Sequence, residues 1–174
     1  MFAEYANYFN GELHTCDISL ENINAAKKFT KNYENKITYY NEDSLIFLQK
    51  FNKPIDLLYL DSLDGHDTEL ASRHQLFEAE IAIKKLHDKS LILLDDKGTK
   101  TNLSLDFFLE NNFQILFETR YQVLLSKRKF NEFYKKFIFL IISSLINDFF
   151  LKNDFFNPSY LHKYFLYLLG LIFT

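Results

Sequence analysis

Acidic residues recur directly after short segments that are apolar or rich in β-branched side chains. Four predicted strands end on or just before such acids, at Asp17, Asp43, Asp61 and the pair Asp95-Asp96. A single acid after a strand is a common turn residue. Four of them at one edge of a sheet would converge in space, and ligands of open α/β sheets bind at that edge. The pattern therefore indicates a ligand site built from carboxylates.

Three of these acids follow the two most apolar strands, namely Asp61, Asp95 and Asp96. If those strands are neighbours, the carboxylates crowd one spot, where repulsion is costly unless a cation lies between them. Oxygen ligands without His or Cys suit Mg²⁺, Mn²⁺ or Ca²⁺ rather than zinc. We therefore expect one divalent-cation site, with Mg²⁺ or Mn²⁺ favoured. The alternative is that Asp61 and Asp95 cap the following helices and Asp96 is solvated.

The elements that must position these acids alternate between strand and helix, which predicts an α/β fold with a parallel sheet covered on both faces. Periodicity predicts strands over residues 12–17, 36–40, 55–60 and 90–94, and a final strand pair over 113–119 and 121–127. It predicts helices over residues 20–32, 45–51, 69–86 and 103–111.

Composition limits the classes of function. The chain has 174 residues, a net charge of −3 and 48% apolar residues, which suits a folded domain with a sizeable core and not a nucleic-acid binder. Its 4 glycines cannot build a G-x-G-x-x-G or Walker loop. The only cysteine, Cys16, excludes an intramolecular disulfide and a Cys-based zinc site, and it favours a reducing compartment such as the cytoplasm.

Six segments together resemble the later two-thirds of a class I S-adenosylmethionine-dependent methyltransferase domain, a Rossmann-like α/β fold. The likeness covers residues 12–128 and is to the small O-methyltransferases of the catechol O-methyltransferase-like and "methyltransferase domain 24" kind. The segments are HTCDIS, YYNEDSLIFL, IDLLYLDSLDGHD, ASRHQLFEAEIAIKKL, SLILLDDKGTK and YQVLLSKRK.

The resemblance implies a role for each of the acids. It implies that Asp17 binds the ribose hydroxyls of S-adenosylmethionine and that Asp43 and Ser44 border the adenine. It also implies that the acids after the next two strands, Asp61 and the pair Asp95-Asp96, bind a divalent cation (Mg²⁺ or Mn²⁺) beside a small-molecule acceptor.

The candidate for the general base is His66, although a loop histidine is more often simply solvated. Some relatives carry a lysine three residues after the first metal-binding Asp, but that position is Asp64 here, so no catalytic lysine is assigned. We expect His74, inside a predicted helix, to have a structural role.

The sequence departs from the family at its start. The first strand and the Gly-rich loop of the family would lie before residue 1, and residues 1–8 would be the end of the first helix. The missing strand normally lies in the middle of the sheet, so we expect two unpaired strand edges. The chain is then a fragment of a longer reading frame, a decayed copy, or a domain in which something else fills the gap.

Composition changes near residue 128, which predicts a partial methyltransferase domain over 1–128 and an apolar tail over 129–174. The tail holds 10 Phe and 4 Tyr, with apolar runs at 137–146 and 160–173 that are too short to span a bilayer. It is expected to be helical and to need a partner surface, which is either the sheet or a second copy of the chain, or a membrane surface. A tail that is non-native coding sequence after a frameshift is a third possibility.

Two hypotheses about function follow. The first is an enzyme that transfers a methyl group from S-adenosylmethionine to the hydroxyl of a small molecule, with metal assistance. The second is a non-catalytic truncated remnant or interaction module that uses the tail to bind a partner or membrane. Saturable binding of S-adenosylmethionine distinguishes the two.

Overall fold

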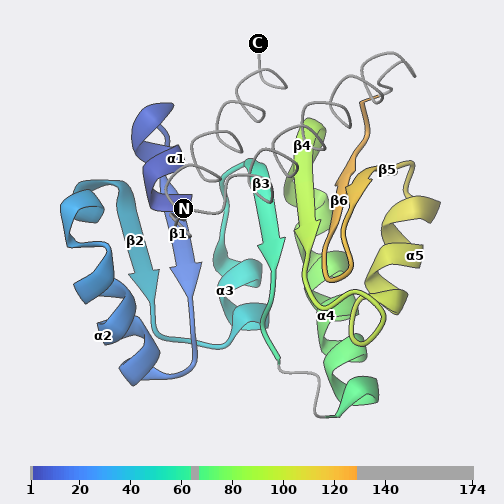
Figure 1. Ribbon diagram of the computed structural model, residues 1–174, viewed down its shortest axis with the longest axis horizontal. Coiled ribbons are helices and arrows are strands. Elements are labelled where there is room, and N and C mark those ends of the chain that lie inside the picture. The colour runs from blue at the N-terminus through green and yellow to red at the C-terminus, as the bar shows by residue number, and fades with distance from the viewer. Residues whose placement is uncertain (1, 64–66, 129–174) are drawn as a thin grey trace, which may run out of the picture. The chain divides into compact units, whose positions relative to one another are not determined.

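The computed structural model describes residues 2–63 and 67–128, which fall in one compact unit of the chain, Phe2–Lys129. Helices and strands alternate along this unit (Figure 1). Its helices are α1 (Phe2–Tyr8), α2 (Leu20–Phe29), α3 (Ser44–Lys50), α4 (Thr68–Ala82) and α5 (Asn102–Glu110), with 3₁₀ helices η1 (Lys31–Lys36) and η2 (Ile83–Lys85). Its strands are β1 (Leu13–Cys16), β2 (Ile37–Tyr40), β3 (Ile55–Leu60), β4 (Leu86–Leu94), β5 (Gln114–Glu118) and β6 (Val123–Ser126).

The strands form two separate sheets. Strands β1 and β2 pair in parallel, with Cys16 opposite Tyr40 at their carboxyl ends. The second sheet has the order β3-β4-β6-β5, in which β3 and β4 are parallel and β6 runs antiparallel to both β4 and β5. The parallel pair β3–β4 realises the arrangement that the sequence left conditional, in which two nearly continuous apolar segments joined by a helix are neighbours in a parallel sheet. The register places Leu60 opposite Leu94, so both strands end together.

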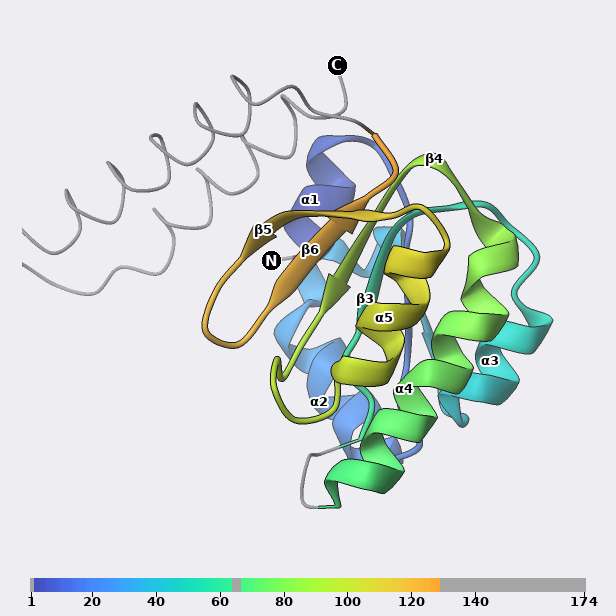
Figure 2. The same cartoon turned by 90° about the vertical axis from the view of Figure 1, so that its right-hand side faces the viewer.

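Apolar burial is concentrated in the four-stranded sheet and the helices that cover it. Residues 90–94 of β4 are all buried, and Phe108 of α5 is fully buried against them in the main core cluster. Figure 2 shows α3, α4 and α5 on one face of the strands and α1 on the other. The alternation of strand and helix in the sequence thus gives the layered α/β arrangement that it predicted.

The expected elements are all present, with corrections at their ends. The helix predicted over residues 69–86 ends at Ala82, because the chain passes through η2 and Leu86 already pairs with Ile55 as the first residue of β4. The helix predicted over 20–32 ends at Phe29, because Thr30 is its C-cap and η1 begins at Lys31.

Strands β1 and β3 each lie at the edge of their sheet. Figure 1 shows their arrows pointing in the same direction, and no strand pairing joins them within the described residues. Within the described residues these two edges have no strand partner, and the missing central strand stays a prediction.

The predictions for residues 129–174 concern a segment outside the described residues and stay predictions. Within the described ranges, none of the helices has both the length and the apolar character needed to cross a bilayer.

Candidate functional site

The carboxyl ends of β3 and β4 bring the predicted metal-binding acids together. Asp61 directly follows β3, and Asp95 directly follows β4. The backbone N–H of Asp95 donates to the Leu60 carbonyl across the strand pair at 3.2 Å. The hydroxyl of Tyr59 lies 2.7 Å from Asp95 Oδ2 and 3.0 Å from Asp61 Oδ2. One phenol thus bridges two acids that are far apart in the sequence.

A lysine completes this cluster. The side chain of Lys100 is only 1% exposed, and its ammonium group lies 2.8 Å from Asp61 Oδ1 and 3.2 Å from Asp96 Oδ2. It also donates to the Leu63 carbonyl oxygen at 3.0 Å. Burial alone would lower the pKa of Lys100, but its hydrogen bonds to the two carboxylates outweigh burial and raise that pKa. The group is therefore a buried cation.

The turn after β4 places Lys100. Asp96 has a φ of 59° and Gly98 a φ of 87°, so the chain passes twice through the left-handed region. Asp tolerates this region better than most residues, and glycine enters it without steric cost. The Thr99 N–H closes the turn on the Asp96 carbonyl at 3.1 Å. Lys100 then faces back towards Asp96, immediately before α5 begins.

Burial also raises the pKa of Tyr59, whose ring packs on Phe2 of α1, and its hydrogen bond to Asp95 adds to this effect. The phenol therefore stays protonated at neutral pH and acts as a donor to the carboxylates. Hydrogen-bond donors and the Lys100 ammonium together offset the repulsion between the three acids.

In the described part of the chain, the oxygen atoms of this cluster are not arranged to bind a divalent ion, because Lys100 already contacts them. Lys100 holds one oxygen of Asp61, one oxygen of Asp96 and a backbone carbonyl, which are the hard oxygen ligands that such an ion prefers. Within the part of the chain that the structure describes, no group of three or more His, Cys, Asp or Glu side chains is arranged to hold a metal. The capping alternative does not describe Asp61 and Asp95 either, because the N-caps of α4 and α5 are Asp67 and Thr101.

The acids after β1 and β2 have local partners instead. Asp17 accepts hydrogen bonds from the Ser19 N–H at 2.7 Å and from the Asn22 side chain at 3.0 Å. Asp43 is the N-cap of α3 and accepts from the N–H groups of Leu45 and Ile46. Both therefore organise the turn between a strand and its helix, as single acids after strands commonly do.

Ser44 connects α3 to α4. Its hydroxyl lies 2.9 Å from His74 Nε2, and the same nitrogen lies 3.5 Å from Glu78 Oε1. The hydrogen bond to Glu78 raises the pKa of His74 against the opposing effect of burial. His74 thus ties two helices together, and the expected structural role agrees with these contacts.

Glu78 is almost completely buried, and its Oε2 has no hydrogen-bond partner among the described residues. Cys16 at the end of β1 is affected by this carboxylate. Burial, followed by the negative charge of Glu78 and of three further acids, raises the pKa of the thiol to about 12. Cys16 is therefore a neutral thiol and not a nucleophile at physiological pH.

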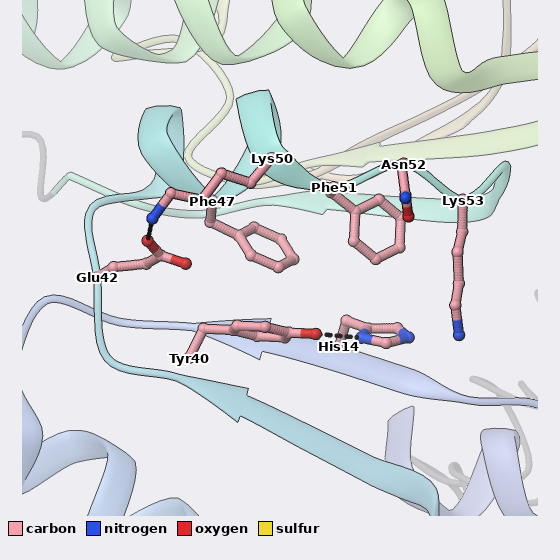
Figure 3. Close-up of a pocket in the computed structure, with 8 residues that line it drawn as sticks. All are labelled: His14, Tyr40, Glu42, Phe47, Lys50, Phe51, Asn52 and Lys53. Carbon is pink, nitrogen blue, oxygen red and sulfur yellow. Dashed lines mark hydrogen bonds and ion pairs between the residues drawn. The ribbon is translucent and has the colours of Figure 1, made fainter.

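A cavity of about 160 Å³ lies beneath α3, on the side of β1 and β2 that faces this helix (Figure 3). The rings of His14, Tyr40, Phe47 and Phe51 form its wall, and the Tyr40 hydroxyl lies 3.1 Å from His14 Nδ1. Lys50 and Lys53 lie at its rim, where they pair with glutamates, so the cavity offers no unbalanced charge. It contains none of the acids named above.

Comparison with known proteins decides the family. A family model for a methyltransferase domain, Methyltransf_24, matches residues 1–97, which is more than half of the chain. The chain belongs to this methyltransferase family. No curated protein matches the sequence. The family assignment confirms the resemblance that the six sequence segments suggested.

Solved structures of methyltransferases share the fold of this family member. A candidate rRNA methylase from Clostridium thermocellum has a TM-score of 0.53 and 15% identity, over 68% of this chain and 76% of that chain. A candidate methyltransferase from Streptococcus mutans, solved with S-adenosylhomocysteine, has a TM-score of 0.51 and 11% identity, over 67% and 76%. The ribosomal protein L11 methylase of Lactobacillus delbrueckii subsp. bulgaricus has a TM-score of 0.51 and 16% identity, over 74% and 65%. At such identities the likeness establishes the Rossmann-like fold alone.

The cofactor-binding and general-base roles that the resemblance implies are not tested by the structure. Asp17 lies on the turn after β1, Asp43 is the N-cap of α3 and Ser44 is its first residue, and their binding of cofactor stays a prediction. His66 lies outside the described residues, so its role as a base also stays a prediction.

Lys100 and Tyr59 are site residues that the sequence did not single out. The available signals were weak: Lys100 lies four residues after Asp96, and Tyr59 precedes Asp61 by two on the same strand.

Proposed function

We propose that this methyltransferase domain transfers the methyl group of S-adenosylmethionine to a hydroxyl oxygen of a small molecule. The observation that carries the proposal is the convergence of Asp61, Asp95 and Asp96 at the carboxyl ends of two neighbouring parallel strands. Ligands of open α/β folds bind at this edge. The family assignment supplies the cofactor class, and the carboxylates supply acceptors for a hydroxyl proton.

Each residue then has a defined task. Asp17 binds the ribose hydroxyls, while Asp43 and Ser44 border the adenine. The acceptor hydroxyl donates to a carboxylate of the cluster, where one oxygen each of Asp95 and Asp96 accepts no hydrogen bond from the described residues. A new bond forms between the acceptor oxygen and the methyl carbon as the carbon–sulfur bond breaks, and the hydroxyl proton leaves through a carboxylate or His66. Positioning provides much of the rate of such an in-line transfer.

The resemblance also implies metal assistance, in which a divalent ion would hold the acceptor oxygen and lower its pKa. The side chain of Lys100 does not favour this part of the function, because it uses the oxygens that the ion would need. We therefore propose methyl transfer here without assigning any step to a metal.

Calorimetric titration of the full chain with S-adenosylhomocysteine tests the proposal. We expect saturable binding, and we expect Asp17→Asn to weaken it at least about tenfold, since hydrogen bonds to a charged group contribute roughly 1.5–3 kcal/mol. Asp88→Asn is the matched control, because Asp88 is exposed at the opposite end of β4. Equal affinities in the Asp17 variant and the parent would contradict the ribose assignment. Transfer of a labelled methyl group to a panel of small phenols and alcohols then tests the acceptor class.

A non-catalytic interaction module is the second candidate. It is favoured by the edges of β1 and β3, which have no strand partner among the described residues and are sites where an extended segment can add as a further strand. It is also favoured by the glycine content, since 4 glycines scattered along the chain build no Gly-rich cofactor loop. A chain that shows no saturable binding of S-adenosylmethionine or S-adenosylhomocysteine would support this candidate and exclude the enzyme.

A further inference from the structure

The ammonium group of Lys100 occupies the centre of an oxygen cage. Its three contacts are Asp61 Oδ1 at 2.8 Å, the Leu63 carbonyl at 3.0 Å and Asp96 Oδ2 at 3.2 Å. Asp61 Oδ1 and the Leu63 carbonyl accept hydrogen bonds from two of its three N–H donors, and Asp96 Oδ2 is its further ion-pair partner. Two carboxylates and a backbone carbonyl are also the ligand types that bind Mg²⁺, Mn²⁺ and Ca²⁺.

The oxygen cage around Lys100 is formed by several elements of the fold and encloses a buried side chain. The side chain of Lys100 is 1% exposed, whereas the carboxylates of Asp61 and Asp96 are 42% and 43% exposed, so the cation lies on the inner side of the acids. The ligands come from the end of β3, the loop after it and the turn after β4. Tyr59 holds the remaining oxygen of Asp61 and one oxygen of Asp95 from the other side.

We propose that the Lys100 ammonium is the resident cation of this carboxylate cluster, in the place of the divalent ion that the family resemblance implies. The lysine and a divalent ion are mutually exclusive, because both need Asp61 Oδ1 and Asp96 Oδ2. The cluster is therefore complete without a metal. One oxygen each of Asp95 and Asp96 stays available to a hydroxyl-bearing ligand. The binding of that ligand rests on the proposed function, whereas the identity of the cation does not.

Charge decides the consequence of removing the lysine. Three carboxylates then share one spot without a counter-ion, and the space left by the ammonium group is lined by oxygen atoms. Such a site attracts a small hard cation strongly, because binding removes the repulsion among the acids. Lys100→Ala should thus convert the cluster into a divalent-cation site.

Titration of the full chain with Mn²⁺, followed by paramagnetic broadening of backbone NMR signals, tests this inference. We expect no selective broadening at Asp61, Asp95 and Asp96 in the parent. In Lys100→Ala we expect selective broadening at all three residues and an affinity for Mn²⁺ at least about tenfold higher. Lys97→Ala is the matched control, because the partly exposed Lys97 pairs with Glu118 and not with the cluster, and it should behave like the parent.

Selective broadening at all three acids in the parent, with equal Mn²⁺ affinity in Lys100→Ala, would overturn the inference. So would a folded Lys100→Ala chain that gains no affinity for Mn²⁺. If this variant does not fold, Lys100→Met keeps the aliphatic stem while removing the charge, and the same two outcomes apply.

The parent also provides a readout of its own. The Lys100 Nζ signal should persist when 10-fold excess Mg²⁺ is added, and its loss would show that the metal displaces the lysine. None of these measurements involves S-adenosylmethionine, so their failure is distinguishable from failure of the proposed function.

Discussion

Acidic residues follow the parallel strands of both sheets, but the range of their hydrogen bonds differs. The carboxylates of Asp17 and Asp43, after β1 and β2, accept hydrogen bonds only from groups no more than five residues away. Asp61 and Asp95, after β3 and β4, bind partners 39 and 36 residues away through Lys100 and Tyr59. The first pair organises turns, whereas the second joins separate elements into one cluster.

The same sequence feature can therefore produce either a helix cap or a multi-residue site. The outcome depends on what the neighbouring elements bring to the strand end. At β3 and β4 the turn through Asp96 and Gly98 returns a buried cation to the acids. Around β1 and β2 each acid instead meets the free N–H groups of its own following turn or helix, which are the nearest donors.

The largest effect on stability is expected for the long-range cluster. Lys100→Ala leaves the three acids without a counter-ion, and we expect the free energy of unfolding to fall by about 2–3 kcal/mol in metal-free buffer, less than for a fully buried pair because the carboxylates are partly solvated. Lys97→Ala should change it by less than about 0.5 kcal/mol. Chemical denaturation of both variants checks the difference, and equal small losses would mean that the cluster is no tighter than a surface ion pair.

The bridging phenol should have the next effect. Tyr59→Phe removes the donor shared by Asp61 and Asp95, and we expect a loss of about 1–2 kcal/mol. A double-mutant cycle with Asp95→Ala should give a coupling energy of about 1 kcal/mol. Tyr121→Phe is the control, because Tyr121 is 59% exposed. Additive losses in the cycle would show that Tyr59 and Asp95 do not act together.

The helix cap at Asp43 should have a smaller and purely local effect. Asp43→Ala removes the acceptor for two N–H groups of α3, with an expected loss of about 1 kcal/mol, whereas Asp43→Ser keeps a capping oxygen and should recover most of it. Thermal unfolding of the two variants measures this. A loss as large as that of Lys100→Ala would remove the distinction between the two regions.

The smallest effect concerns His74, which connects α3 to α4. Because Glu78 raises the pKa of His74 in the folded state, the protonated form stabilises the fold. This contribution is fully present below the ordinary histidine pKa, near 6.5, and is lost as the pH rises through the raised value. His74→Gln should thus cost more stability at pH 5.5 than at pH 8.5, by under about 1 kcal/mol. His87→Gln serves as the control, and a pH-independent cost for His74→Gln would contradict the assignment.

The sequence by itself determined which segments form the elements and where the acids fall. A nearly continuous apolar run made 55–60 a strand, and the helical spacing of 103–111 made it a helix, because side-chain direction and backbone hydrogen bonding repeat locally at a fixed period. The six family segments indicated the methyltransferase family because their order, spacing and strand context can be read from the sequence.

The chemistry at the strand ends was decided only by the tertiary structure. The pattern of acids predicted convergence of Asp61, Asp95 and Asp96, and the β3–β4 pairing together with the shared hydroxyl of Tyr59 brings them to one place. It did not predict that Lys100 would be their cation, because a lysine in a turn is ordinarily solvated. The left-handed turn directs Lys100 to Asp61 and the Leu63 carbonyl, which are 39 and 37 residues away, and contacts at that range leave no local pattern in the sequence.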